Sequence, residues 1–182
     1  MVAAAAVLPK VTPGLVRRLR GLRDSKQLSA ARRDYFHAEV RACAVSTAIG
    51  VVSAAALDSL GLSAAGRLAM ERAVRGLEVW PDFLLIDAFP LPSVELPQEA
   101  IIFGDALCLS IAAASVIAKV ERDRLLVGLS EQYPGYGFER HKGYGTREHA
   151  RALVERGLTP EHRCSYAPIR AILERGGDAL AT

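Results

Sequence analysis

Hydrophobic and polar positions divide the chain into short apolar runs and longer stretches with helical spacing. The apolar runs have the length of strands and lie at residues 2–8, within 43–53, at 83–87 and at 101–103. Helical spacing and capping residues predict a helical turn at 15–23 and helices at 29–42, from Ser63 onward, at 106–132, after Thr146 and at 168–175. Because strands alternate with helices, the pattern predicts an α/β domain with a mixed sheet.

The length of the chain indicates a single structural unit. With 182 residues, of which 51% are hydrophobic and 24% charged, the chain is long enough to bury a core without disulfides or a structural metal. We expect residues 1–132 to form the main core. Residues 133–182 are then expected to add a loop and helices to the same unit.

The sequence carries no signal for a membrane or for export. The longest nearly uncharged stretch, residues 42–57, is shorter than the roughly 20 apolar residues that a bilayer span needs. The N-terminal apolar run follows Met1 without the basic region of a signal peptide. The three cysteines are too widely spaced for a disulfide framework or a clustered zinc site. We therefore expect a cytoplasmic protein.

Charge is distributed unevenly, although the net charge is only +3. Residues 1–41 contain nine basic and three acidic side chains, whereas residues 42–118 contain three basic and eight acidic ones. Residues 119–175 are basic again, with eleven against eight. A basic surface around an acidic centre suits a metal-dependent phosphodiesterase, since Lys and Arg bind phosphate while carboxylates bind cations.

Two aspartates stand where a strand ends and where a helix begins. Asp87 closes the apolar run at 83–87, and Asp105 precedes the helix at 106–132. Each has a purely structural explanation, because Asp87 can accept hydrogen bonds from turn amides and Asp105 can cap the helix. As a pair on adjacent elements they also fit Mg²⁺, which binds few carboxylates and keeps several waters. Both interpretations stay open at this point.

The strip at residues 133–146 interleaves aromatic, glycine and basic residues and reads YPGYGFERHKGYGT. Aromatic faces can stack on bases or sugars, glycines let the backbone approach a ligand, and Arg140, His141 and Lys142 can contact phosphates. An aromatic loop that packs on the core explains the strip equally well. His141 and His149 have no acidic or cysteine partner nearby in the sequence, which disfavours a zinc site.

Several motifs occur in a fixed order along the whole chain. They are Asp24-Ser25-Lys26-Gln27-Leu28-Ser29 with Arg33, Ala69-Met70-Glu71-Arg72-Ala73-Val74, Leu85-Ile86-Asp87, Gly104-Asp105-Ala106 running into IAAASVIAKVERD, YPGYGFERHKGYGTREH, and His162-Arg163. In this order and spacing they resemble bacterial ribonuclease HII, the type 2 ribonuclease H family. The resemblance implies a ribonuclease H-like mixed sheet flanked by helices, with a C-terminal helical extension.

The resemblance also implies an activity. It is the endonucleolytic cleavage of RNA in RNA–DNA hybrids, and of single ribonucleotides embedded in DNA, with Mg²⁺ or Mn²⁺ and with water as nucleophile. The products carry 3′-hydroxyl and 5′-phosphate ends. The family's catalytic metal ligands match Asp87 and Asp105, and Tyr144 corresponds to a platform for a sugar or base. The residues that the resemblance places near phosphates are Ser25, Lys26, His141 and Lys142. The expected partner is therefore a hybrid duplex, bound by a monomer.

The sequence departs from the family's pattern at its start. Family members carry an adjacent Asp-Glu pair on a first strand and a Gly-Arg-Gly loop before the strand that MVAAAAVLP resembles. We therefore expect the first strand and two of the four metal-binding carboxylates to be missing here. Further departures are Ala88-Phe89 where Gly-Asn is usual, Phe103 where Lys is usual, and Cys164 where Arg is common.

These departures leave a second function open. A catalytically impaired remnant would keep the basic flanks and the aromatic strip, and would act as a non-catalytic nucleic-acid-binding module. It would lack the carboxylates that hold two cations. A small-molecule phosphohydrolase is disfavoured, because no Gly-rich phosphate cradle accompanies the aspartates.

Overall fold

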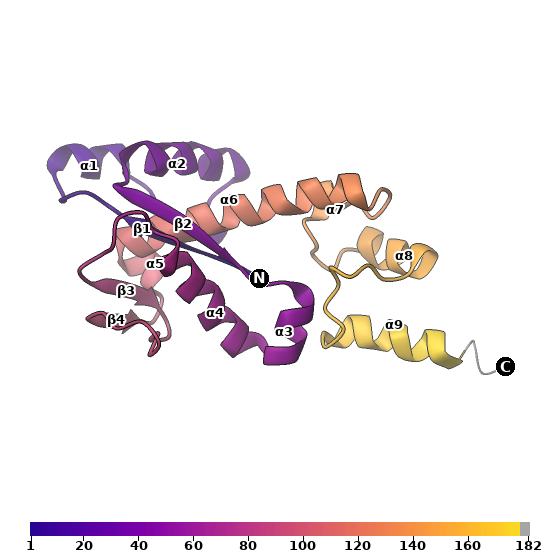
Figure 1. The fold of residues 1–182 in the computed structure, drawn as a ribbon. Helices are drawn as coiled ribbons and strands as arrows, with labels where there is room; N and C mark the ends of the chain where they lie inside the picture. The colour runs from indigo at the N-terminus through magenta and orange to yellow at the C-terminus, as the bar shows by residue number, and fades with distance from the viewer. Residues whose placement is uncertain (179–182) are drawn as a thin grey trace. The chain divides into compact units, whose positions relative to one another are not determined.

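The computed structural model describes residues 1–178 (Figure 1). The chain forms two compact units. The first unit comprises Met1–Val51 and Gly66–Glu121. The second comprises Val52–Ala65 and the chain from Arg122 onward. The expected division into a core at 1–132 and an extension at 133–182 stays a prediction.

The first unit contains two small sheets with helices around them. Its elements are β1 (Val2–Val7), α1 (Pro13–Arg18), the 3₁₀ turn η1 (Ser25–Gln27), α2 (Ala30–Cys43), β2 (Ser46–Val51), β3 (Leu84–Asp87), β4 (Gln98–Ile101) and α5 (Gly104–Leu107). Strand β1 pairs antiparallel with β2, and β3 pairs parallel with β4. The α/β class is thus confirmed. Within residues 1–178 the strands form two two-stranded sheets where one mixed sheet was expected.

The second unit is helical in the part that the structure describes. It contains α3 (Ala54–Leu60), α7 (Phe138–His141), α8 (Arg147–Arg156) and α9 (Ala167–Asp178). Two helices run from one unit into the other, namely α4 (Leu62–Arg75) and α6 (Leu109–Gln132). No helix within residues 1–178 is long and apolar enough to cross a membrane.

Alanines on β1 bring apolar side chains together on both faces of the strand. Successive side chains of a strand point to opposite faces. Ala4 and Ala6 pack against one cluster of buried residues, which is Leu15, Leu19, Val40, Ala113 and Ile117. Ala5 packs against another, which is Val74, Leu84, Ile86, Leu91 and Val94. The side chains on β1 are small, so both clusters lie close to its backbone.

Glycine at position 50 allows β2 to touch the backbone of α4. A Cβ atom at Gly50 would lie 1.9 Å from the carbonyl oxygen of Ala69 and 2.6 Å from the amide nitrogen of Ala73. Neither backbone atom can move without shifting the helix. The strand and the helix therefore pack at a distance that no side chain at position 50 permits.

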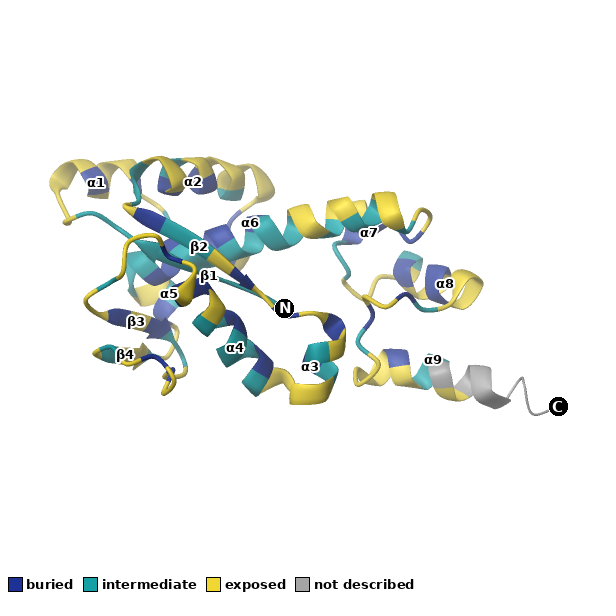
Figure 2. Cartoon of the chain, in the orientation of Figure 1, coloured by how far each residue is buried: buried dark blue, intermediate teal, exposed yellow. Residues whose placement is uncertain are grey.

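The buried face of α6 explains the run of small residues in its sequence. Its buried positions fall between Ile111 and Val120 (Figure 2). Ala113 and Ile117 belong to the cluster beneath β1, and Val116 packs with Phe36 of α2. Small side chains let these neighbours approach the helix closely.

The second unit is held together by an aromatic core and by one carboxylate. Tyr136 and Phe138 are buried and stack at 5.4 Å between ring centroids. Asp58 of α3 accepts hydrogen bonds from the amides of Cys164 and Ser165 at 2.6 and 3.2 Å, and from the Ser165 hydroxyl. These bonds lower the pKa of Asp58, the Ser165 hydroxyl contributing most.

Most of the predicted helix starts are confirmed. Ser29 caps α2 by accepting from the amide of Arg32, and Thr146 caps α8 by accepting from the amide of His149. The cap at Ser63 was wrong, because a separate helix, α3, precedes it. That helix is capped by Ser53 and ends at Gly61, whose φ of 79° stops the helix, so α4 already begins at Leu62.

The region around Asp105 also differs from the prediction. The strand expected at 101–103 is β4 and ends at Ile101, because Phe103 has left-handed backbone (φ 58°). Asp105 lies inside the short helix α5 and does not cap it. The long helix starts at Leu109 instead of position 106, because extended backbone at Cys108 separates α5 from α6.

Candidate active site

The parallel pair β3–β4 brings Asp87 and the start of α5 to the same edge of the small sheet. Asp87 is paired in register with Ile101, so both strands end at the same level. The Asp87 Oδ1 atom accepts a hydrogen bond of 3.0 Å from the amide of Gly104. Asp87 therefore does accept a turn amide, while the carboxylate remains partly exposed.

Glycine at position 104 lets the Ile111 side chain of α6 pack against this turn while the Gly104 amide bonds to Asp87. A Cβ there would lie 2.5 Å from Cδ1 of Ile111 and 3.5 Å from Oδ1 of Asp87. The close approach joins the end of β3 to the first turn of α5, which carries Asp105. The two aspartates are thus positioned by adjacent elements, as the sequence indicated.

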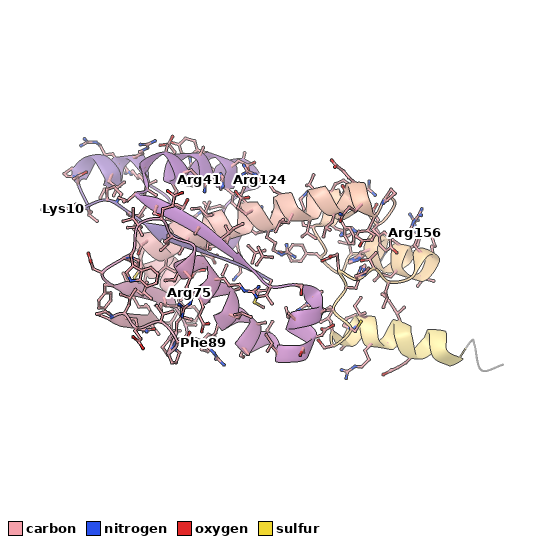
Figure 3. All side chains as sticks on the ribbon, in the orientation of Figure 1. Lys10, Arg41, Arg75, Phe89, Arg124 and Arg156 are labelled. Carbon is pink, nitrogen blue, oxygen red and sulfur yellow. The ribbon has the colours of Figure 1, made fainter. Side chains whose placement is uncertain are left out.

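Left-handed backbone follows both strands of the pair. Ala88 has a φ of 65° and Phe103 a φ of 58°. This conformation costs a residue other than glycine about 1–2 kcal/mol. The amide of Phe89 donates to the carbonyl of Asp87 at 2.8 Å and closes a tight turn around Ala88. Phe89, which is labelled in Figure 3, is half-exposed. Strained backbone of this kind clusters at functional sites.

An open hollow of about 370 Å³ lies at this edge of the sheet. Its lining residues are Asp24, Lys26, Asp87, Ala88, Ile102, Phe103 and Asp105. Burial raises the pKa of Asp105, and the negative charges of Asp24 and Asp87 raise it further. The charge of Lys26 acts in the opposite direction. The hollow therefore gathers carboxylates that repel one another, next to a single ammonium group.

Oxygen donors of this kind suit a hard divalent cation. Asp87 and Asp105 both contribute carboxylates to the hollow. Within residues 1–178, however, no three His, Cys, Asp or Glu side chains are grouped closely enough to hold a metal ion. The two aspartates fit such a cation because their carboxylate oxygens are suitable donors. Water or substrate would occupy the other coordination positions of the cation.

Asp24 lines the hollow although sequence reasoning did not select it. It is the only acidic residue among the first 33 positions, which are otherwise strongly basic. This isolation is the feature of the sequence from which Asp24 could have been selected. Its Oδ1 accepts a 2.9 Å hydrogen bond from the amide of Lys26 and so caps the turn η1.

The two predicted phosphate contacts in this turn lie in different environments. Lys26 is exposed and lines the hollow. Ser25 is buried, and its hydroxyl lies 2.9 Å from that of Ser115 on α6. The Arg33 guanidinium donates to the carbonyl of Ser25 at 3.1 Å. Ser25 therefore anchors the turn from which Lys26 projects.

The aromatic strip of the second unit contains both core and surface residues. Tyr136 and Phe138 are buried, as the packing interpretation expected. Tyr144 is 57% exposed, and the Arg122 guanidinium lies 5.3 Å from the centroid of its ring. Arg122 also donates to the carbonyl of Lys142 at 3.0 Å. Only Tyr144 of these three rings is open enough to stack on a ligand.

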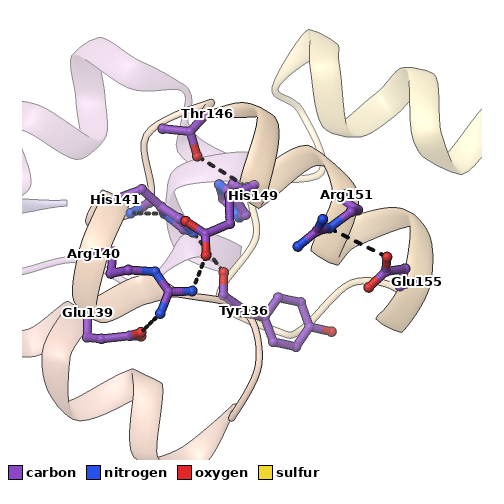
Figure 4. Close-up of polar contacts among 10 residues, drawn as sticks. Tyr136, Glu139, Arg140, His141, Thr146, His149, Arg151 and Glu155 are labelled. Atoms are coloured by element: carbon purple, nitrogen blue, oxygen red, sulfur yellow. Dashed lines mark hydrogen bonds and ion pairs between the residues drawn. The ribbon is translucent and has the colours of Figure 1, made fainter.

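His141 is buried and both of its ring nitrogens are engaged within the chain (Figure 4). Its Nε2 lies 2.7 Å from the carbonyl oxygen of Tyr136, and its Nδ1 accepts from the amide of Gly143 at 3.2 Å. Beside it, Arg140 pairs with Glu139 and Glu148. His141 thus braces the turn that carries Lys142.

Comparison with known proteins identifies the family. The sequence profile named Ribonuclease HII matches residues 1–169. The chain belongs to the ribonuclease HII family. Family members cleave RNA in RNA–DNA hybrids and depend on divalent metal ions. The resemblance found in the motifs is therefore confirmed.

Individual relatives agree with this assignment. The chain is 44% identical over 179 residues to the ribonuclease HII of Dehalococcoides mccartyi strain BAV1, covering 96% of this chain and 81% of that protein. It is 50% identical over 174 residues to the ribonuclease HII of Geobacillus kaustophilus, covering 96% of this chain. The chain spans 65% of the length of that second relative.

Solved structures show the same fold. The ribonuclease H2 of Pyrococcus horikoshii superposes with a TM-score of 0.72 at 24% identity, covering 96% of this chain and 98% of that one. An RNase HIII solved in complex with Mn²⁺ superposes with a TM-score of 0.68 at 17% identity, covering 97% of this chain and 65% of that one. The expected ribonuclease H-like fold is thus confirmed.

Proposed function

We propose that this chain is an endoribonuclease that cleaves the RNA strand of RNA–DNA hybrids, including single ribonucleotides embedded in DNA. One observation supports this most directly. In a member of the ribonuclease HII family, Asp87, Asp105 and Lys26 line one hollow at the end of two parallel strands. Carboxylates for a cation and an ammonium for a phosphate are the groups that phosphodiester hydrolysis needs side by side.

In this proposal Asp87 and Asp105 hold Mg²⁺ or Mn²⁺. Such an ion, when bound, polarises a phosphoryl oxygen and lowers the pKa of a coordinated water. The Lys26 ammonium contacts a phosphate at the rim of the hollow, and the buried Ser25 keeps its turn in place. Water adds to phosphorus and the bond to the 3′ oxygen breaks, leaving 3′-hydroxyl and 5′-phosphate ends.

The second unit contributes binding in the same proposal. Tyr144 offers its exposed ring to a sugar or base, and Lys142 contacts a phosphate. His141 supports that contact from inside the turn, because its ring nitrogens bond to the Tyr136 carbonyl and the Gly143 amide. We further propose that the protein acts as a monomer in a reducing cytoplasm, where its three free cysteines stay unpaired.

The test is cleavage of matched duplexes by the purified chain. The panel contains a DNA duplex with one ribonucleotide, a longer RNA–DNA hybrid and an all-DNA duplex, each with Mg²⁺, with Mn²⁺ or with chelator. We expect metal-dependent cuts on the 5′ side of the ribonucleotide and none in all-DNA. Hybrid binding with no cleavage under any metal would instead support the non-catalytic binding module.

The contributions of Lys142 and Tyr144 to binding can be separated by measuring how affinity depends on salt concentration. Lys142→Ala should reduce the slope of log affinity against log salt by about one unit, because one phosphate contact is lost. Tyr144→Ala should weaken hybrid binding by about 1–3 kcal/mol with the slope unchanged, because stacking involves no counterion release. The measurement is a fluorescence-anisotropy titration at several salt concentrations. Unchanged affinity in both variants would mean that the strip serves only core packing.

A further inference from the structure

Three buried histidines of the second unit form a cluster. His141, His149 and His162 are each at most 7% exposed. The rings of His141 and His149 stack at 4.4 Å between centroids with an interplanar angle of 16°. The Nε2 atoms of His149 and His162 lie 3.1 Å apart, within hydrogen-bond distance. Figure 4 shows His141 and His149 side by side.

The hydrogen bonds at the Tyr144 end determine which nitrogen of His149 carries a proton. The Nδ1 atom of His149 lies 3.1 Å from the carbonyl oxygen of Tyr144. A carbonyl oxygen can only accept, so Nδ1 must carry the hydrogen. In a neutral ring the Nε2 of His149 is then an acceptor. Its neighbour at 3.1 Å, the Nε2 of His162, must therefore donate.

The hydrogen bonds at the Thr159 end lead independently to the same direction. The amide of Thr159 donates to Nδ1 of His162 at 3.0 Å, so this nitrogen carries no hydrogen. The Thr159 hydroxyl lies 2.9 Å from the same nitrogen and can donate to it as well. The Thr159 carbonyl oxygen, which can only accept, is more distant at 3.3 Å, so the two shorter contacts determine the state of this nitrogen. A neutral His162 then has its proton on Nε2, facing His149. Both ends thus require the same direction of hydrogen bonding. Thr159 donates to His162, His162 donates to His149, and His149 donates to the carbonyl oxygen of Tyr144.

The peptide groups of Tyr144 are held from both sides. The Tyr144 amide donates to the carbonyl of His141 at 2.9 Å. The Tyr144 carbonyl accepts from the amide of Thr146 at 2.8 Å as well as from His149. The exposed ring of Tyr144 is therefore attached to backbone whose position depends on buried imidazoles.

We propose that His149 and His162 are positioning residues, which set the place of the Tyr144 ring for nucleic acid through this ordered pair of hydrogen bonds. The inference rests on the proposed function, because it concerns the substrate contact of Tyr144. Neither imidazole touches substrate. Their effect on binding passes through the carbonyl of Tyr144.

The ordered pair requires both rings to be neutral. A proton on Nε2 of His149 would face the hydrogen that His162 presents, so two donors would oppose each other. Burial lowers the pKa of His149 and that of His162, and the charge of a neighbouring imidazole lowers each further. Titratable or charged groups beside the cluster include Tyr136, Tyr144, Glu148 and Arg140, of which the last two pair with each other. The neutral pair therefore persists at pH 7.

Nitrogen-15 NMR of the histidine rings tests the order directly, without substrate. We expect the Nδ1–H tautomer for His149 and the Nε2–H tautomer for both His162 and His141. A spectrum with His149 protonated on Nε2 at pH 7.5 would overturn the ordered pair whatever the enzyme's activity.

Hybrid affinity tests the positioning role. His162→Leu removes the donor and should weaken binding to a ribonucleotide-containing duplex about 5–10-fold at pH 7.5. His162→Gln keeps an amide donor and should stay within about 2-fold of the unaltered chain. In a Tyr144→Ala background, His162→Leu should have no further effect. Glu155→Gln, in an exposed pair with Arg151 on the same unit, serves as the control (Figure 4).

The pH profile separates this role from a loss of folding. Affinity of the unaltered chain should hold at and above pH 6.5, the ordinary pKa of imidazole, and fall only at lower pH, because the pKa of each ring is lowered and protonation breaks the pair. Phosphate binding by added positive charge would change in the opposite direction. His162→Gln should remove the fall, because its amide can turn its oxygen toward a protonated His149.

Three results would overturn the proposal. They are unchanged affinity in folded His162→Leu, full additivity with Tyr144→Ala, or a rise in affinity on acidification. If the unaltered chain binds no hybrid at all, the proposed function itself fails and the role in binding fails with it. The tautomer spectrum distinguishes that case from an error in the hydrogen-bond order.

Discussion

Asp87→Asn will reduce hybrid cleavage by on the order of 100-fold or more while leaving hybrid affinity nearly unchanged. Residues that only support a metal ligand cost about 10–100-fold in metal affinity or activity when lost, so a direct ligand costs at least the upper end. The variant keeps the oxygen that accepts from the amide of Gly104, so the turn after β3 is preserved. What the substitution removes is negative charge in the hollow.

Two measurements check this prediction, one of them independent of catalysis. The first is the single-turnover cleavage rate on a duplex with one ribonucleotide. The second is Mn²⁺ binding followed by electron paramagnetic resonance, in which the variant should bind more weakly and Mg²⁺ should compete. Asp82→Asn, an exposed aspartate five positions earlier, should match the unaltered chain in both. Equal Mn²⁺ affinity in Asp87→Asn and the unaltered chain would refute the ligand assignment.

Gly50→Ala will destabilise the first unit by about 3 kcal/mol or more, the upper range for overpacking a core. The added methyl group would lie 1.9 Å from the carbonyl oxygen of Ala69 and 2.9 Å from Cβ of Arg72. Strand β2 and helix α4 would have to separate. At about 2–4 °C for each kcal/mol, the melting temperature should fall by roughly 10 °C.

The same substitution at Gly128 provides the control for this prediction. Gly128 lies in α6, and outside the adjoining helix backbone no atom lies within 4 Å of the position of an added Cβ. Alanine there should raise stability by about 1 kcal/mol, because it favours the helix without meeting a neighbour. Denaturant titrations of both variants measure the difference. A loss below about 1 kcal/mol at Gly50 would contradict the close packing of β2 on α4.

Local features of the chain were enough to predict most elements. The apolar run at the N-terminus is β1, and the capping hydroxyls at Ser29 and Thr146 begin α2 and α8. A capping side chain bonds to an amide only three residues away, so its signal is contained in the sequence. The prediction at Ser63 failed because Ser53 caps an earlier helix that Gly61 ends, so that α4 begins directly after Gly61 at Leu62.

The site could be predicted in part. Asp87 and Asp105 could be selected from the sequence, because Asp87 closes an apolar run and Asp105 precedes a helical pattern. The fold places both at one hollow. Asp24 was not selected, because its isolation among basic residues does not indicate a partner, and its charge reaches Asp105 only after η1 and α5 pack in the same unit. The strained backbone at Ala88 and Phe103 was also unpredictable, because it follows from the way the two strands end together.

By itself the sequence determined the family, the α/β class and the identity of the chemistry-bearing side chains. Order and spacing of motifs carry that information along the chain. Tertiary structure alone decided which aromatic residue of the strip is exposed, because Tyr136 and Tyr144 look alike in sequence and differ only in what packs on them. It also decided the partner of His162, whose ring lies within hydrogen-bond distance of His149 although the two residues lie beyond the range of any local pattern. Burial and hydrogen-bond direction depend on neighbours brought together by folding, and sequence spacing does not specify them.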